Sequence, residues 1–266
     1  MRCCFDPSEY TGVPDTEPCA RTLDVPAVIR GLDALYAQSR EDEAQSYLER
    51  HLSEAREIGD WRAELAFTSE LLGQYRRSMD EQKGLGAVDD AMELVREHRL
   101  GRTVSGATVL LNAATTLCCF GQNAEALPIF RHVSRVYADN LDPLDYRFAG
   151  LYNNMANAHA ALGETEQAEG LFHAALRILE NLEGGGCETA VTLCSLAELY
   201  DAADPEDGRI AEVLERAWET LDDPALRRDG YYAFMASKCV PVFDRLGFFL
   251  YANDLKERIR DIHERS

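Results

Sequence analysis

Apolar residues recur at spacings of three and four along most of the chain, which is the pattern of amphipathic α-helices. The stretches with this spacing come in pairs, and a short turn joins the two members of each pair. Gly121, Gly163, Asp204-Pro205 and Gly247 mark four of these turns. No segment shows the alternation of a β-strand for more than about four residues. The pattern therefore predicts an all-α protein built from helical hairpins.

The hairpins repeat at a nearly constant spacing. At a shift of 42 residues, the segment Leu151 to Leu179 aligns with the segment Val109 to Tyr137. Small residues such as Ala126 and Ala168 recur where two helices must approach closely, because a bulky side chain would push the pair apart. We predict an irregular arm over residues 1–24 and a repeat domain over 25–266. The predicted units begin near Val25, Leu65, Ala107, Ala149, Ala190 and Ala233.

The arm lacks the apolar run of a secretory signal and contains several prolines. Three of the eight cysteines, Cys3, Cys4 and Cys19, lie in it. We interpret the arm as a loose tail, with a metal site as the less favoured alternative. No CxxC pair occurs in the chain, and the cysteine usage predicts a reducing, cytoplasmic location. Cys118 and Cys119 fall inside a helical pattern, where we expect small buried hydrophobes.

The chain carries 47 Asp and Glu against 27 Lys and Arg, a formal charge of −20. This balance argues against nucleic acid as the main partner, because phosphate binding needs a positive surface. It favours a partner segment that is basic or neutral, provided that the acids reach the binding surface. The 22 residues from Thr103 to Ala124 carry no charge, but their polar residues favour a buried helix and a turn over a membrane span.

No sequence motif of catalysis is present. The chain lacks a P-loop, GxGxxG, HExxH and GxSxG, and its six histidines form no pair with metal-ligand spacing. Paired acids are expected by chance among so many carboxylates. We therefore predict a protein that is not an enzyme and has no cofactor or metal.

The fourth unit shows a recognisable pattern: Tyr152, Met155-Ala156, His159, Gly163, Ala168, Phe172 and Ala175. This pattern resembles the tetratricopeptide repeat, and the spacing of 42 resembles the longer repeats of the kinesin light chain group. The resemblance implies a right-handed α-α superhelix (solenoid) of about six helix-turn-helix units. It also implies a role in binding proteins or peptides. Stacked hairpins of this kind bury a continuous core and leave a curved surface.

In repeats of this type the first helices line the concave face. Peptide-binding members carry asparagines there, and an asparagine amide can both donate to and accept from a peptide backbone. Asn112 and Asn154 are 42 residues apart, so we expect them to stack in adjacent units. The alternative is that these asparagines are merely solvated. The candidate partner-binding residues are Asn112, Asn154, Asn157, Asn153, Arg30 and Lys238.

An aromatic cluster marks the last unit, and two interpretations of it stay open. Aromatic side chains anchor many interfaces, but a final unit with only one neighbour also needs core residues. We favour the core interpretation. The cluster consists of Tyr231, Tyr232, Phe234, Phe243, Phe248, Phe249 and Tyr251.

Two functions fit this sequence. The first is a non-catalytic scaffold that binds a protein or peptide segment on the concave face. The second is a peptide-sensing module of a bacterial signalling system. Members of the second class usually carry an N-terminal DNA-binding domain or a helical output bundle, and about 22 residues precede the first predicted unit here. We therefore expect the scaffold, with an oligomeric state that the sequence leaves open.

Overall fold

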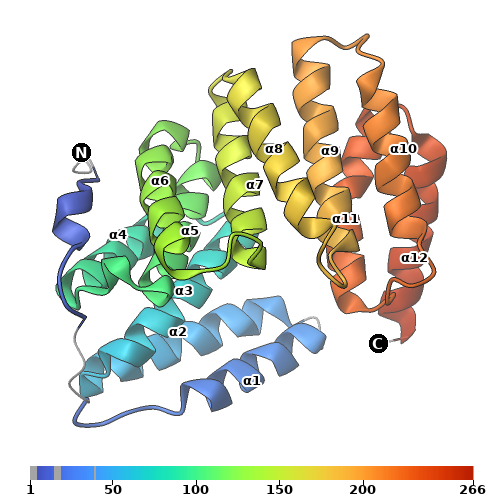
Figure 1. Cartoon of the computed structure of the whole chain (residues 1–266). Helices are drawn as coiled ribbons and strands as arrows, with labels where there is room; N and C mark the ends of the chain where they lie inside the picture. The colour runs from blue at the N-terminus through green and yellow to red at the C-terminus, as the bar shows by residue number, and fades with distance from the viewer. Residues whose placement is uncertain (1–4, 15–18, 39, 266) are drawn as a thin grey trace. The chain divides into compact units, whose positions relative to one another are not determined.

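The computed structural model describes residues 5–14, 19–38 and 40–265, and every regular element in these ranges is helical. Twelve α-helices and two short 3-10 helices occur, and no β-strand is present in the described part of the chain (Figure 1). The predicted all-α fold class is therefore confirmed.

The chain forms two compact units, Met1–Asp142 and Pro143–Ser266, called unit 1 and unit 2 below. Unit 1 contains η1 (Pro7–Tyr10), α1 (Val25–Ala37), α2 (Glu41–Ile58), α3 (Trp61–Arg77), α4 (Glu81–Glu97), η2 (Leu100–Arg102), α5 (Val104–Cys119) and α6 (Asn123–Asn140). Unit 2 contains α7 (Tyr146–Ala161), α8 (Thr165–Leu179), α9 (Gly186–Ala203), α10 (Arg209–Asp222), α11 (Gly230–Arg245) and α12 (Phe249–Arg265).

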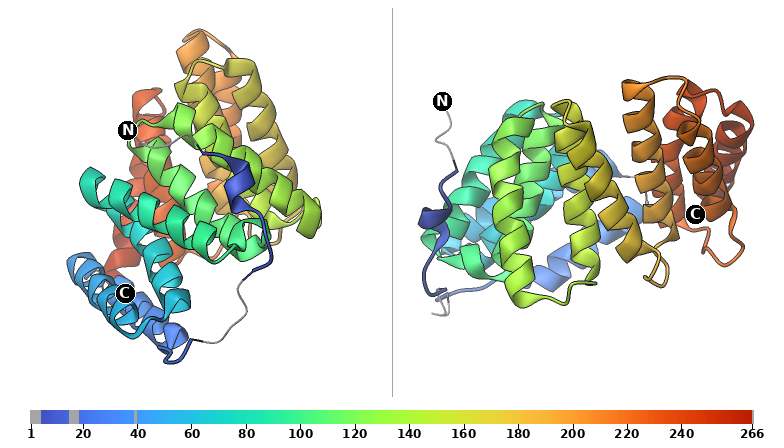
Figure 2. Two further views of the ribbon diagram at one scale, coloured as in Figure 1. Left: turned by 90° about the vertical axis from the view of Figure 1, so that its left-hand side faces the viewer. Right: turned by 45° about the horizontal axis from the view of Figure 1, so that its top comes forward.

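Consecutive α-helices pair into antiparallel hairpins, three in each unit (Figure 1 and Figure 2). We call the odd-numbered α-helices first helices and the even-numbered ones second helices. Within unit 1 the first helices α3 and α5 pack on each other, and within unit 2 α9 packs on α7 and on α11. Every hairpin begins between zero and four residues before the unit start that the repeat predicts. The uncharged stretch after Thr103 forms α5 and the turn that follows it, as expected.

Local sequence signals explain where the hairpins start and turn. The carboxylates of Asp24 and Asp60 accept hydrogen bonds from the amides of Ala27 and Ala63 and so cap α1 and α3. Gly121, Gly163 and Gly247 have positive φ angles of 78°, 75° and 86°. A left-handed residue ends the first helix of a hairpin, and glycine adopts that conformation without a steric penalty.

Alanines and aromatic side chains build the core of both units. Ala126 in unit 1 and Ala168 in unit 2 are fully buried, as the repeat predicts for close helix contacts. Phe130 on α6 and Phe172 on α8 are also fully buried and lie 42 residues apart. The same repeat position therefore fills the core in both units.

The N-terminal arm is ordered over part of its length, which corrects the interpretation as a loose tail. Tyr10 is only 4% exposed, and its ring lies 4.7 Å from that of Phe5 and 6.1 Å from that of His132. A Cβ atom on Gly101 would lie 2.3 Å from the Tyr10 carbonyl oxygen, so only glycine permits this approach. Of the arm's cysteines, Cys3 and Cys4 lie outside the described residues.

Two further expectations need correction. Cys119 is exposed rather than buried, because it stands at the last turn of α5, beside Met79 of the α3–α4 turn. The aromatic residues of the last hairpin, α11–α12, lie partly in the core and partly on the surface. Tyr232 and Phe243 are fully buried, whereas Tyr231, Phe234 and Phe249 are 52%, 45% and 60% exposed.

Candidate partner-binding surface

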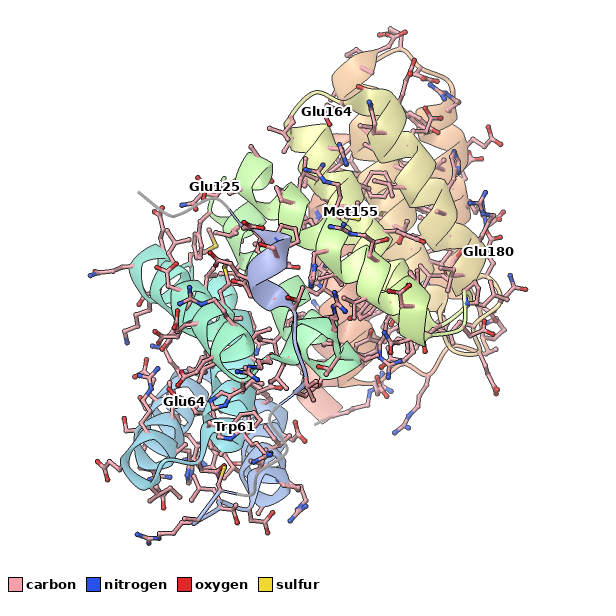
Figure 3. The ribbon with its side chains drawn as sticks, turned by 60° about the vertical axis from the view of Figure 1, so that its left-hand side comes forward. Trp61, Glu64, Glu125, Met155, Glu164 and Glu180 are labelled. Atoms are coloured by element: carbon pink, nitrogen blue, oxygen red, sulfur yellow. The ribbon has the colours of Figure 1, made fainter. Side chains whose placement is uncertain are left out.

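Acidic residues are divided unevenly between first and second helices. The six second helices hold 23 Asp and Glu against 13 Lys and Arg. The six first helices hold seven of each kind. Figure 3 labels one of these acids, Glu125 on α6, and two further acids, Glu164 and Glu180, which flank α8. The excess negative charge therefore lies away from the first helices, whose summed charge is zero.

The first helices of unit 2 expose a narrow polar and aromatic strip. Most of α9 is buried, and what it exposes recurs every three or four residues from Glu188 through Ser195 to Glu198. The helices α7 and α11 lie against α9 and expose equivalent stripes. We call the combined area the first-helix surface of unit 2. Its residues are Arg147, Asn153, Asn154, Asn157, Glu188, Val191, Ser195, Glu198, Tyr231, Phe234, Lys238 and Arg245.

Hydrogen bonds between the first helices fix this surface. Asn153 on α7 donates from Nδ2 to Thr192 Oγ1 on α9 at 2.7 Å. Tyr231 on α11 donates its hydroxyl proton to Glu188 Oε1. Burial and the neighbouring Glu188 carboxylate raise the pKa of the Tyr231 hydroxyl, which keeps it a donor. These bonds set the stripes side by side at the N-terminal half of the three helices.

An ion pair closes the other half of the same surface. Arg245 on α11 donates from Nη2 to Glu198 Oε1 at 2.8 Å and from Nη1 to Asp201 Oδ2 at 2.7 Å. Both carboxylates belong to α9. Each carboxylate at this end therefore has a cationic partner within the protein, and α9 and α11 are bound together there.

Four of the candidate residues lie on this surface. Asn154 is half-buried and Asn157 is exposed, and neither side chain has a hydrogen-bond partner among the described residues. Asn153 donates one N–H of its amide to Thr192, so this side chain is already held within the protein. Lys238 is exposed, and its Nζ lies 4.3 Å from the centre of the Phe234 ring. Free amide groups are thus available at Asn154 and Asn157.

The other two candidates belong to unit 1. Arg30 is exposed on α1. Asn112 on α5 is half-buried and donates from Nδ2 to Ser69 Oγ at 3.0 Å, while its backbone carbonyl accepts from Arg76 Nη1 at 3.2 Å. One N–H of the Asn112 side chain is therefore already used within the protein. The expected stacking of Asn112 with Asn154 joins two different units and stays a prediction.

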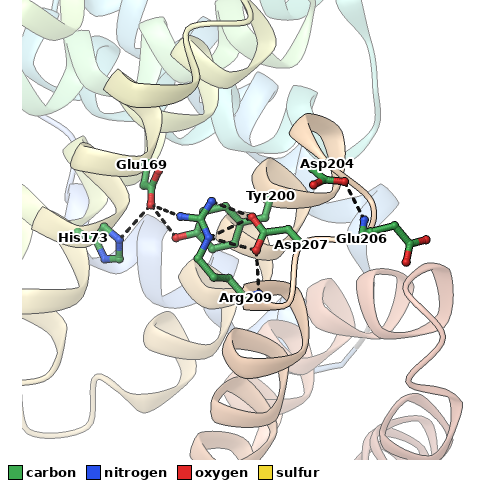
Figure 4. Close-up of polar contacts among 7 residues, drawn as sticks. All are labelled: Glu169, His173, Tyr200, Asp204, Glu206, Asp207 and Arg209. Atoms are coloured by element: carbon green, nitrogen blue, oxygen red, sulfur yellow. Dashed lines mark hydrogen bonds and ion pairs between the residues drawn. The ribbon is translucent and has the colours of Figure 1, made fainter.

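A cluster of charged and aromatic side chains anchors the C-terminal half of α9 (Figure 4). Tyr200 and Arg209 Nη1 both donate to Glu169 Oε1 at 2.9 Å. The Arg209 guanidinium also lies 3.9 Å from the centre of the Tyr200 ring. Burial, together with the bond to Glu169, raises the pKa of Tyr200 to about 12. The cluster ties α8, α9 and α10 together.

Unit 1 contains the same arrangement at α2, α3 and α4. Tyr75 donates to Glu49 Oε1 at 3.1 Å, Lys83 Nζ donates to the same oxygen at 2.8 Å, and that Nζ lies 5.8 Å from the centre of the Tyr75 ring. In both units a glutamate on a second helix accepts hydrogen bonds from two residues of the following hairpin. One is a tyrosine on its first helix, and the other is a cationic side chain on its second helix. The recurrence indicates a structural anchor between hairpins.

Sequence reasoning missed the strongest polar features of the unit 2 surface. Glu188 was not a candidate, because a lone acid in a chain with 47 acids carries no signal. Tyr231 and Phe234 were assigned to the core with the rest of the aromatic cluster. The repeat register could have revealed these residues. Tyr231 lies seven residues before Lys238, and Glu188 lies seven before Ser195, so each pair falls on the same face of its helix.

Neither a membrane-spanning helix nor a cluster of metal ligands occurs in the part of the chain that the structure describes. No helix there is long and apolar enough to cross a membrane. No group of three or more His, Cys, Asp or Glu side chains there could hold a metal ion.

Comparison with known proteins identifies the repeat. Residues 147–207, which span α7, α8 and α9, match the tetratricopeptide repeat family. A Podosopora anserina protein assigned as a kinesin light chain, with nearly identical TPR-like repeats, is 18% identical; the match covers 81% of this chain and 99% of that one, with a TM-score of 0.54. BtubC (BKLC) from P. vanneervenii is 19% identical, and its match covers 85% of this chain and 91% of that one, with a TM-score of 0.56. At these identities the likeness shows the fold. No curated protein matches the sequence.

Proposed function

We propose that this chain is a non-catalytic scaffold that binds a protein or peptide segment on the first-helix surface of unit 2, because residues 147–207 match the tetratricopeptide repeat family. Repeats of this family suggest protein–protein interaction in general. The choice of surface comes from the side chains. Asn154 and Asn157 on α7 have unused amides, and Tyr231 and Phe234 expose aromatic rings on α11, on the other side of α9.

The free amides of Asn154 and Asn157 carry the proposal. An asparagine amide can donate to a peptide carbonyl and accept from a peptide N–H. In unit 1 the equivalent amide, that of Asn112, is bonded to Ser69. A bound segment would therefore gain hydrogen bonds on the surface of unit 2 without breaking any that the protein already makes.

The division of charge bears on the kind of partner. The second helices carry half of the chain's net charge of −20, and the first helices sum to zero. We therefore infer a partner segment that is neutral overall, instead of one chosen by long-range attraction to a strongly acidic surface. Aromatic side chains in such a segment would find Tyr231 and Phe234 as stacking platforms.

A peptide selection tests the proposed function. Peptides from a random displayed library are selected on the full-length chain, and the affinity of the best is measured for variants. Asn154→Ala combined with Asn157→Ala should weaken binding by about tenfold, since each lost hydrogen bond costs roughly 0.5–1.5 kcal/mol. The matched control is Asn253→Ala, which removes an exposed asparagine of the second helix α12 and should change the affinity less than twofold. Equal affinities for the double variant and the wild type would refute this function.

A further inference from the structure

Three buried acceptor oxygens of unit 2 have no hydrogen-bond donor among the described residues. One of them, Asp254 Oδ2 on α12, is ion-paired with Arg258 Nε. The other two are Asn153 Oδ1 on α7 and Glu188 Oε2 on α9, and both are out of contact with solvent. A buried acceptor without a donor costs free energy, and more so when it belongs to a charged group. Such atoms therefore mark a place where a donor from outside the chain would be bound favourably.

The two oxygens are linked through Thr192. Asn153 Nδ2 donates to Thr192 Oγ1 at 2.7 Å, and Thr192 Oγ1 donates to the backbone carbonyl of Glu188 at 2.8 Å. Glu188 and Thr192 are one turn apart on α9, so the two free oxygens lie on neighbouring helices at nearly the same level. Thr192 accepts one N–H of the Asn153 amide, and the two oxygens stay without a donor.

Glu188 also lacks a cation. Among the described residues its side chain has one partner, the Tyr231 hydroxyl. The other surface acids of α9, Glu198 and Asp201, share Arg245. The position of Glu188 in the first turn of α9 explains how an unpaired charge is tolerated there, since the helix dipole favours it. It does not supply a donor to Oε2.

The cationic residues whose helical positions are nearest to Glu188 interact with other side chains. Arg147 on α7 donates to Asp145 Oδ2 at 2.8 Å and lies over the Tyr146 ring. Lys238 on α11 lies over the Phe234 ring. The unpaired carboxylate is therefore not neutralised by the protein's own residues on this surface.

We propose that the Glu188 carboxylate, Asn153 Oδ1 and the Tyr231 ring form a binding site for an arginine side chain of the partner segment. A guanidinium is a planar cation with five donors, so it can serve a carboxylate and an amide oxygen together. The face of an aromatic ring attracts the same cation. This site rests on the proposed function, because it gives the chemistry of one contact on the same surface.

Tyr231 controls access to the site. Both free oxygens are hidden from solvent, so a guanidinium reaches them only when a neighbouring side chain moves. The Tyr231 side chain is the one bonded to the carboxylate, and it is 52% exposed, so few contacts oppose its rotation. Its turning outward exposes the carboxylate and leaves the ring at the edge of the site.

The test uses the full-length chain and a small probe in place of the partner. N-acetyl-arginine amide is titrated into isotope-labelled protein, and chemical shifts are followed at the Asn153 side-chain amide, Glu188 and Tyr231. The neutral analogue N-acetyl-citrulline amide, which has the same shape, is the control probe. We expect saturable shifts with arginine and an affinity at least about tenfold lower with citrulline, because a charge-assisted bond is lost.

Matched variants separate this site from general effects of charge. Glu188→Gln should lower the affinity for the arginine probe about tenfold, whereas Asp201→Asn, on the same helix but paired with Arg245, should leave it within about twofold. Tyr231→Phe keeps the ring and releases the carboxylate, so it should tighten binding. Resonances distant from α9 confirm that each variant is folded.

Three results would overturn the proposal. They are no saturable shift at the three residues with arginine, equal affinity for citrulline, and an affinity that Glu188→Gln leaves unaltered. The first would also mean that water satisfies the two oxygens. If selected peptides still depend on Asn154 and Asn157, only the arginine site fails; if they do not, the proposed function fails as well.

Discussion

Asn112 in unit 1 and Asn154 in unit 2 occupy the same place in the repeat but have different surroundings. The Asn112 side-chain amide donates to Ser69, and the backbone carbonyl of Asn112 accepts from Arg76. Asn154 has no side-chain partner among the described residues. The residue facing Asn112 from the preceding first helix is therefore what decides whether this position is structural or free to bind.

The surfaces around the two asparagines differ in the same way. In unit 1, Tyr36 donates to Gln74 Oε1 at 2.9 Å, and Arg76 Nη1 donates to Thr116 Oγ1 at 2.8 Å. These bonds join α1 to α3 and α3 to α5. In unit 2, Tyr231 is half-exposed and Glu188 has an oxygen without a donor. These bonds hold the helices of unit 1 together, whereas Asn154 and Asn157 of unit 2 have no side-chain partner among the described residues.

The largest expected effect shows where the two units are alike. Phe130→Ala in unit 1 and Phe172→Ala in unit 2 each remove a fully buried ring. Each should lower the free energy of unfolding by about 3–5 kcal/mol, through lost burial and a cavity. Urea unfolding measures this loss. Phe249→Ala, at an exposed ring, is the control and should change the free energy by less than about 0.5 kcal/mol. A large difference between the two buried sites would mean that the cores are not equivalent.

A smaller effect separates the two asparagines. Asn112→Ala breaks the bond to Ser69 and should cost about 0.5–1.5 kcal/mol of unfolding free energy. Asn154→Ala breaks no bond to a described residue and should stay within about 0.5 kcal/mol of the wild type. Equal losses at the two positions would show that Asn154 is structural too.

Neutralising Glu188 and neutralising Glu198, two surface acids of α9, should have different effects on the free energy of unfolding. Glu188→Gln keeps an acceptor for Tyr231 and removes an unpaired charge, so it should leave stability unchanged or raise it by up to about 1 kcal/mol. Glu198→Gln weakens an exposed pair with Arg245 and should cost less than about 1 kcal/mol. Thermal unfolding of the two variants gives the sign. A loss of more than 1 kcal/mol for Glu188→Gln would contradict an unpaired carboxylate.

The smallest expected effect is a pH dependence of stability that comes from His132 in unit 1. Burial lowers the pKa of His132 below its usual value of 6.5, although the hydrogen bond to the Gly101 carbonyl opposes the shift. The folded state therefore binds this proton less tightly than the unfolded state. Stability from this group is complete above pH 6.5 and falls as the pH is lowered through 6.5 toward the folded-state pKa.

The measurement is the change in unfolding free energy between pH 7.5 and pH 6, for the wild type and for His132→Gln. Glutamine retains a donor for the Gly101 carbonyl and does not titrate. The wild type should lose more stability on acidification than the variant. Identical losses would show that His132 does not contribute.

Sequence periodicity predicted the helical hairpins and their turns because these depend on local spacing and on single residues such as Gly121 and Gly163. It also placed Asn154 and Asn157 on the exposed side of a first helix. It did not predict that Tyr10 is buried, since this depends on the room that Gly101 leaves some ninety positions later. Nor did it find the role of Glu188, because an unpaired acid is recognised only when its neighbours in space are known.

The central claim is that a partner binds unit 2 through its first helices. Chemical-shift mapping of the full-length chain with a selected peptide tests this claim most directly. We predict that the perturbed side chains lie on α7, α9 and α11 and include Asn154 and Asn157. Perturbations confined to α3 and α5, or to the acidic second helices, would contradict it.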